Sequence, residues 1–215
     1  MSKYLIIVEG KADIIFIKDY LMFIYKHFKI IKELNKKNKK EIVIQSTNIE
    51  IKILIAGGYT VIKENKFIKS MEEHKDSEYK ILIIQDADNP KKDDGGVENR
   101  MKYLNDTSIE FKTFLFPNNK DDGDLETLLL QIKNNNKYNS FFECYSEYVK
   151  CIKTNTKLDY IDELLEDKNK VFSYFTSYYG MDKAKEENRE YTLEYWNFNS
   201  DSLKPLKIFI EKNIV

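Results

Sequence analysis

The residues in this sequence that could do chemistry are acids that directly follow apolar, β-branched runs. Glu9 follows the run from Tyr4 to Val8. Asp86 and Asp88 follow a second run, from Lys80 to Ile84. In an open α/β sheet, residues at the carboxyl ends of parallel strands face a shared crevice in which ligands bind. We therefore expect these three carboxylates to lie close together.

Carboxylates gathered in one crevice repel each other unless something neutralises them. At about 4 Å, with an effective dielectric constant of about 20, two ionised carboxylates repel by roughly 4 kcal/mol. A cluster of three therefore predicts a bound cation or a shared proton. Because Mg²⁺ prefers oxygen ligands and retains bound waters, a magnesium site is the simplest hypothesis, with Mn²⁺ as the alternative ion.

The composition limits the classes of protein to which this chain could belong. Its 215 residues contain 35 Lys and Arg and 36 Asp and Glu, giving a formal net charge of −1. Neither a disordered chain nor a globally basic nucleic-acid-binding protein fits this balance. No apolar run approaches the length of a membrane helix and no signal peptide is recognisable, so we expect a cytoplasmic protein without a membrane partner. Cys144 and Cys151 are expected to be reduced, buried thiols.

Strands and helices are expected to alternate along the first 134 residues. The predicted strands are 4–8, 51–55, 80–84 and 111–116, with a further short strand at 42–45. This alternation predicts an α/β fold in which helices cover both faces of a central, mostly parallel sheet. Beyond Asn134, aromatic-rich helical segments follow one another without a convincing strand. We expect a single domain over 1–215, with a sheet core at about 1–134 and a helical C-terminal portion at about 135–215.

The motif Glu9-Gly10-x-x-Asp13, together with Asp86-x-Asp88, resembles the Toprim domain, the catalytic fold shared by topoisomerases, primases and the overcoming-lysogenization-defect class of nucleases. The order agrees as well, since Gly57-Gly58 follows the second well-defined strand and the Asp-x-Asp pair follows the third. Later features, Leu125-Glu126 and Tyr195-Trp196-Asn197-Phe198, are similar to features of small stand-alone Toprim-like bacterial proteins of unknown function. The resemblance therefore implies a Toprim-like, Rossmann-like fold over roughly the whole chain.

This resemblance implies magnesium-assisted phosphoryl transfer. In a one-metal version Asp86 and Asp88 hold the ion while Glu9 is the general base or acid. In a two-metal version Glu9 bridges toward both aspartates and Glu126 anchors the second ion. The implied metal ligands are Glu9, Asp13, Asp86, Asp88 and Glu126. Capping of helix N-termini and turn formation are the structural alternatives for these acids.

Positive charge for a nucleic acid must come mainly from lysines, because Arg100 and Arg189 are the only arginines. The basic segment from Lys26 to Lys40 is expected to be a solvated helix end and loop, and it is also the best candidate for a phosphate-contacting surface. Lys183, in Lys183-Ala184-Lys185, resembles a lysine of related Toprim proteins, which implies that it neutralises charge on the scissile phosphate; a plain surface lysine is the alternative. The expected nucleic-acid contacts are Lys11, Lys36, Lys37, Lys39, Lys40, Lys91 and Lys92.

The preferred functional hypothesis is a stand-alone Toprim-type nuclease that hydrolyses phosphodiester bonds with Mg²⁺. The resemblance further implies a defence system in which a partner, such as an ATPase, supplies targeting. The chain has no room for the gating domains of a topoisomerase, and it lacks the Cys/His pattern of a primase zinc site. Two alternatives remain: a non-catalytic Toprim module that binds nucleic acid or a partner protein, and a binder of a small phosphate or nucleotide.

Overall fold

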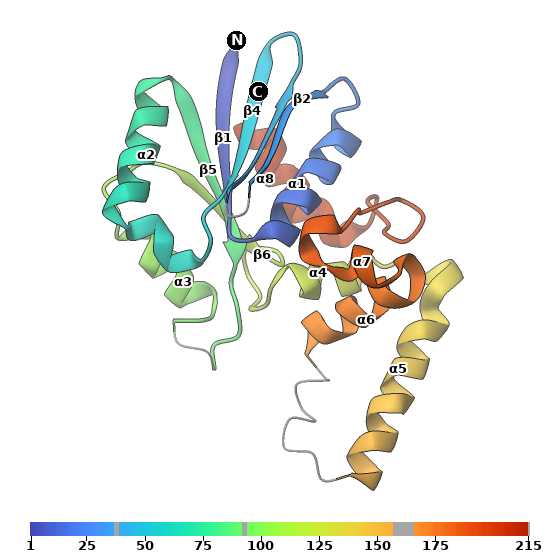
Figure 1. The fold of residues 1–215 in the computed structure, drawn as a ribbon. Helices are drawn as coiled ribbons and strands as arrows, with labels where there is room; N and C mark the ends of the chain where they lie inside the picture. The colour runs from blue at the N-terminus through green and yellow to red at the C-terminus, as the bar shows by residue number, and fades with distance from the viewer. Residues whose placement is uncertain (37–38, 92–93, 157–165, 215) are drawn as a thin grey trace.

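The centre of the fold is a six-stranded sheet with the strand order β2-β3-β4-β1-β5-β6 (Figure 1). The computed structural model describes residues 1–36, 39–91, 94–156 and 166–214. Strands β4, β1, β5 and β6 are parallel to their neighbours in this group, whereas β3 is antiparallel to both β2 and β4. The strand bounds are β1 (Ser2–Val8), β2 (Lys29–Lys36), β3 (Lys39–Gln45), β4 (Ile49–Ile55), β5 (Tyr79–Asp86) and β6 (Lys112–Phe116).

Helices follow the strands in the order that the sequence predicts. Those of the first part are α1 (Lys11–Ile24), α2 (Asn65–Asp76), α3 (Val97–Asn105) and α4 (Leu125–Ile132), with a 3-10 helix η1 (Tyr59–Lys63). Those of the C-terminal part are α5 (Asn135–Asn155), α6 (Asp167–Tyr179), α7 (Met181–Ala184) and α8 (Lys204–Asn213), with the short 3-10 helices η3 (Glu186–Asn188) and η4 (Asp201–Leu203). Within the predicted helical C-terminal portion, residues 157–165 lie outside the described ranges.

Strand β1 shows why helices must cover both faces of the sheet. Its side chains alternate between two hydrophobic clusters, with Tyr4, Ile6 and Val8 in one and Leu5 and Ile7 in the other. All of them are at most 1% exposed. A strand that is apolar on both faces is typical of a parallel sheet between two helical layers. The predicted fold class, a mostly parallel α/β sheet with a helical C-terminal part, is therefore confirmed.

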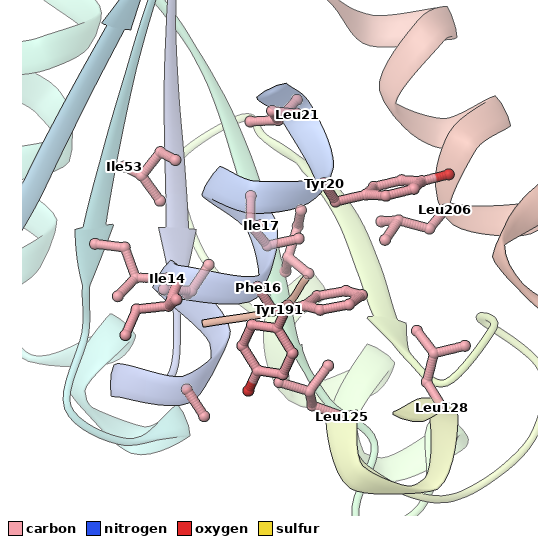
Figure 2. Close-up of a cluster of buried hydrophobic side chains, with 14 of the residues drawn as sticks. Ile14, Phe16, Ile17, Tyr20, Leu21, Ile53, Leu125, Leu128, Tyr191 and Leu206 are labelled. Atoms are coloured by element: carbon pink, nitrogen blue, oxygen red, sulfur yellow. The ribbon is translucent and has the colours of Figure 1, made fainter. Parts of the chain in front are cut away.

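The larger cluster packs α1 between the sheet and the C-terminal helices (Figure 2). Ile14, Ile17 and Leu21 recur at helical spacing and lie against Ile53 of β4. Burying a side chain of this size contributes roughly 1.5–3 kcal/mol, so this stripe anchors α1 and, with it, the strand end that precedes it. On the other side of α1, the ring of Phe16 meets that of Tyr191 with centroids 5.3 Å apart.

The smaller cluster holds α2 and α3 on the opposite face. Met71 of α2 and Leu104 of α3 are each 1% exposed and pack with Ile83 of β5. Among the described residues, no helix is both long enough and apolar enough to cross a bilayer. Because helices cover both faces of the sheet, polar groups converge at the ends of the strands, and the predicted acids lie at the carboxyl end.

Two expectations about local structure are wrong. The basic segment that begins at Lys26 is not a helix end and loop, because β2 and β3 form an antiparallel hairpin that extends the sheet. Buried Ile42 and Ile44 alternate along β3 and fix this hairpin against β4, so the predicted short strand at 42–45 is confirmed as part of β3, whereas β2 was not predicted. Cys144 and Cys151 lie on α5 and are exposed rather than buried.

Candidate functional site

Strands β1 and β5 bring two of the predicted acids to the same edge of the sheet. They pair in parallel, with Val8 opposite Ile84. Glu9 follows β1 directly, and Asp86 is the last residue of β5. Burial, and after it the charges of Asp13 and Glu9, raise the pKa of Asp86 well above its usual value. The acids from these strand ends therefore act on each other electrostatically.

The Asp86 carboxylate also contacts the N-terminus of helix α4. It is 7% exposed, and its Oδ1 accepts a hydrogen bond from the backbone N–H of Leu125 at 2.9 Å. Asp124 caps the same helix by accepting from the Thr127 N–H at 2.9 Å. Unpaired N–H groups at a helix N-terminus favour negative charge. This anchor fixes the Asp86 carboxylate at the centre of the site and gives it a structural role as well.

Asp13 enters the site from the first turn of α1. It is 6% exposed, and its Oδ2 accepts a hydrogen bond from the Gly10 N–H at 2.6 Å. Burial raises the pKa of Asp13 to about 7, with a further contribution from the charge of Glu126, while the Gly10 hydrogen bond acts in the opposite direction. Without a bound cation, Asp13 is therefore a group that shares a proton with its neighbours near neutral pH.

Both arginines of the chain are buried against predicted metal ligands. Arg189 Nη1 donates to Glu126 Oε1 at 3.1 Å, and Arg100 Nη2 donates to Asp88 Oδ2 at 2.6 Å. Each arginine side chain is 3% exposed. The sequence predicts neither pairing. Arg189 is 63 positions from Glu126 and Arg100 is 12 positions from Asp88, so neither pair leaves a local pattern. A buried charge is tolerated when it is paired in this way, so these contacts neutralise Glu126 and Asp88.

Asp88 does not continue the geometry of Asp86. Strand β5 ends at Asp86, and Asp88 has a left-handed φ of 61°. Its backbone instead pairs with Gly123, donating to the Gly123 carbonyl at 2.6 Å. Asp86 and Asp88 therefore do not share one extended segment, because strand β5 stops between the two residues.

Glu9 interacts with the charge of one arginine-paired acid, Asp88, and has an unsatisfied oxygen. Burial raises the pKa of Glu9, the charge of Asp88 adds to this, and Arg100 and Lys168 oppose it. Its Oε2 is buried and has no hydrogen-bond partner within the described ranges. The Oε1 and Nε2 atoms of the fully buried Gln85 also have no hydrogen-bond partner among the described residues. Buried polar atoms are rarely left unsatisfied in proteins, so Glu9 is the acid best placed to accept a ligand.

Lys168 is the lysine that faces the cluster, and the sequence did not identify it. It lies in the first turn of α6, where the Thr127 hydroxyl donates to Asp167 at 3.1 Å and ties α6 to α4. Desolvation alone would lower the pKa of Lys168, but the carboxylates of Asp86, Glu126, Asp124 and Asp88 raise it. The charged run in which it stands, Glu166-Asp167-Lys168, has no pattern that distinguishes it from an ordinary helix start.

The lysines predicted from the sequence lie mostly elsewhere. Lys183 forms an ion pair with Glu190, and Lys11 pairs with Glu187 at 3.6 Å, both at the surface. Lys91 is exposed and follows the loop after β5. Lys36, Lys39 and Lys40 belong to the paired strands β2 and β3, near the strand ends on the same side of the sheet as the acids, because Glu41 is opposite Leu54 near the end of β4. Lys37 and Lys92 lie outside the described residues.

A pocket with a volume of about 390 Å³ opens beside the cluster. It lies between the loop after β5, the turn before α4 and the start of α6. Its charged lining residues are Asp122, Asp124, Glu166, Asp167 and Lys168. Acids outnumber the lysine, so a phosphate group requires an added cation to bind there.

The cluster fits a divalent cation in donor chemistry but not in a complete ligand geometry. Within the described ranges, no group of three or more His, Cys, Asp or Glu side chains is arranged to hold a metal ion. Asp88 and Glu126 are engaged by the arginines, whereas Glu9 retains a buried oxygen without a partner. Mg²⁺ commonly binds through one or two carboxylates and keeps several waters. Glu9 and Asp86 are therefore the residues that could hold such an ion.

Comparison with known proteins places the chain in a family. The crystal structure of hypothetical protein PH0156 from Pyrococcus horikoshii OT3 is similar at 19% sequence identity, with a TM-score of 0.48, and the match covers 99% of this chain and 95% of that one. No curated protein matches the chain. Residues 3–214 match the family described as "Protein of unknown function (DUF3226)". Because that match spans almost all of the sequence, the chain belongs to the DUF3226 family.

Proposed function

We propose that the acid cluster at the ends of β1 and β5 binds Mg²⁺ or Mn²⁺, and that the protein is a Toprim-type nuclease that hydrolyses phosphodiester bonds in nucleic acid. The observation that carries this proposal is the convergence of Glu9, Asp13 and Asp86 in one buried site, where the charge of Glu9 raises the pKa of Asp13 and the charges of both raise the pKa of Asp86. The Toprim-like order of Glu9, Gly57-Gly58 and Asp86 along the strands also supports it. A protein gains nothing in stability from such mutual repulsion, so a ligand-binding role accounts for it better than a purely structural one.

The residues divide the work according to their surroundings. Glu9 and Asp86 would hold the ion, which when bound activates a water and neutralises phosphate charge. Because burial raises the pKa of Glu9, this carboxylate is also a candidate for proton transfer. Arg100 and Arg189 hold Asp88 and Glu126 in place, and Lys168 faces the pocket where a phosphate would lie.

The proposed partner is a nucleic acid that approaches along the carboxyl edge of the sheet. The β2–β3 hairpin supplies lysines at that edge, where they could contact the phosphate backbone on either side of the cleavage point. Association with an ATPase or another component of a defence system rests on the Toprim resemblance alone.

A non-catalytic Toprim module is the second candidate. The buried Arg100–Asp88 and Arg189–Glu126 pairs favour it, because each neutralises an acid that a two-metal mechanism would need. In that case the protein would bind nucleic acid or a partner protein without turnover.

The decisive test measures Mn²⁺ binding by electron paramagnetic resonance and cleavage of plasmid and single-stranded oligonucleotides with Mg²⁺ or Mn²⁺. Asp86→Asn keeps an acceptor for the Leu125 N–H but removes the charge, so we expect both a loss of Mn²⁺ binding and at least about a 100-fold loss of cleavage. Asp201→Asn is the control. The Asp201 side chain is 87% exposed and lies in η4, before α8, so this variant should leave Mn²⁺ binding and cleavage unchanged. Mn²⁺ binding without cleavage would favour the non-catalytic module, and no Mn²⁺ binding would contradict the proposed site.

A further inference from the structure

A second pocket, with a volume of about 420 Å³, lies at the opposite end of the sheet from the acids. It opens at the amino ends of β5 and β6, beside the last turns of α2 and α8 (Figure 1). Among the described residues that line it are Lys75, Lys80, Lys112 and Lys212, against the single acid Glu110. The chain as a whole is almost neutral, with a net charge of −1, so positive charge is segregated at this pocket.

The fold itself brings these lysines together. Lys80 and Leu82 are two residues apart on β5 and share a face of the sheet. Leu82 is opposite Lys112 of β6, which places Lys80 and Lys112 on neighbouring strands of that same face. Lys212 comes from α8, which packs on this face against β6, and Lys75 comes from α2 on the other face.

Helix termini explain only part of this arrangement. Lys75 and Lys212 stand in the last turns of their helices, where a cation complements the helix dipole. Lys80 and Lys112 are strand residues, and no helix end accounts for them. Lys80 contacts the ring of Tyr4 with its ammonium 5.5 Å from the ring centroid, and within the described ranges none of the four lysines forms an ion pair. Four lysines that share one pocket with a single acid, none of them in an ion pair among the described residues, favour an anionic ligand.

The rest of the lining is apolar and aromatic. Ile81 is buried and Phe111 is half-buried, and both belong to the smaller hydrophobic cluster. The ring of Tyr79 is held in place because its hydroxyl donates to Glu50. A pocket of this size suits a small molecule, and its lining offers both a cationic rim and a surface for a planar group.

We propose that this pocket binds a nucleoside polyphosphate without a divalent cation, through its lysines and its aromatic floor. The lysine ammonium groups contact the phosphates, and Phe111, the aromatic floor of the pocket, packs against the base. This site is separate from the acid cluster, which needs a cation before it can accept a phosphate. The inference therefore stands whether or not the protein cleaves nucleic acid.

Isothermal titration calorimetry with ATP in the presence of EDTA tests the inference, because chelation removes the divalent cation that the acidic end requires. We expect ATP to bind about tenfold more tightly than inorganic triphosphate, and adenosine to bind weakly. Failure of ATP to bind in EDTA would overturn the inference. Equal affinities for ATP and triphosphate would overturn the role of the aromatic floor.

Charge-reversal variants assign the binding to this pocket. Lys80→Glu with Lys112→Glu should weaken ATP binding at least tenfold, and Lys80→Gln with Lys112→Gln should weaken it to a smaller extent. The matched control, Lys66→Glu with Lys69→Glu, changes the charge of the protein equally at exposed positions near the start of α2 and should retain wild-type affinity. All three double variants replace exposed residues, and thermal melting checks that they fold. An equal loss in the control would assign the binding to net charge and overturn the site.

Discussion

The two ends of the sheet carry opposite charges, and they differ in how those charges are buried. At the carboxyl end, Asp13, Asp86 and Glu126 are all at most 7% exposed. At the amino end, Lys75, Lys80, Lys112 and Lys212 are all exposed to solvent. Water stabilises the lysines, whereas the acids depend on hydrogen bonds, arginines and shared protons. The acidic end is therefore a site of fixed geometry, and the lysine end is one whose side chains can adapt to a ligand.

This contrast teaches which charges the fold depends on. Removing one member of a buried pair leaves its partner without compensation, whereas removing an exposed charge leaves a solvated neighbour. Removing one charge should therefore lower the free energy of unfolding much more at the acidic end than at the lysine end.

The largest expected effect comes from Arg189→Met, which leaves Glu126 buried without its partner. We expect the free energy of unfolding in urea to fall by about 3 to 5 kcal/mol. The matched control is Lys204→Met, which breaks the exposed pair with Asp201 and should cost at most about 1 kcal/mol. Similar costs for both variants would remove the distinction between buried and exposed charges.

A smaller effect is expected in the pH dependence of stability. The folded-state pKa of Asp13, about 7, lies above its unfolded value, so between about pH 4 and 7 the folded protein binds more protons than the unfolded chain. The free energy of unfolding should therefore fall as the pH rises through this window. Scanning calorimetry in EDTA should show that Tm drops by at least about 3 °C between pH 5.5 and pH 8.

The Asp13→Asn variant and added Mg²⁺ test whether Asp13 causes the decrease of Tm with pH. The substitution should reduce this decrease and raise Tm at pH 8. Mg²⁺ binds the ionised carboxylates, so it should stabilise the wild type more at pH 8 than at pH 5.5. A slope that neither change affects would show that other groups dominate the pH dependence.

The smallest expected effect separates two lysines. Lys168→Gln should lower cleavage about five- to tenfold, which corresponds to roughly 1 kcal/mol, because it removes the charge that faces the cluster. Lys183→Gln is the control, since Lys183 pairs with Glu190 at the surface. Both should change the free energy of unfolding by less than about 0.5 kcal/mol. A larger loss of cleavage with Lys183→Gln would restore the assignment made from the sequence.

Most of the sheet could be predicted from the sequence because its strands are buried on both faces. Runs such as Ile51 to Ile55 and Lys80 to Ile84 are too apolar to lie anywhere else, and acids that follow them must emerge at the sheet edge. Strand β2 was missed because its apolar residues, Ile30, Ile31 and Leu34, are exposed and do not alternate with polar ones. The turn of the backbone at Asp88 was not predicted, because a left-handed residue after a strand leaves no signal in its own identity.

The sequence by itself determined the α/β architecture and the arrival of Glu9 and Asp86 at one edge, because apolar periodicity and strand ends are local properties of the chain. Only the tertiary structure decided what neutralises those acids. Arg189 reaches Glu126 across 63 positions, and Lys168 faces Asp86 from a helix in the other half of the chain. The physical reason is that electrostatic partners are chosen by distance in space, and the packing that sets this distance involves residues throughout the sequence.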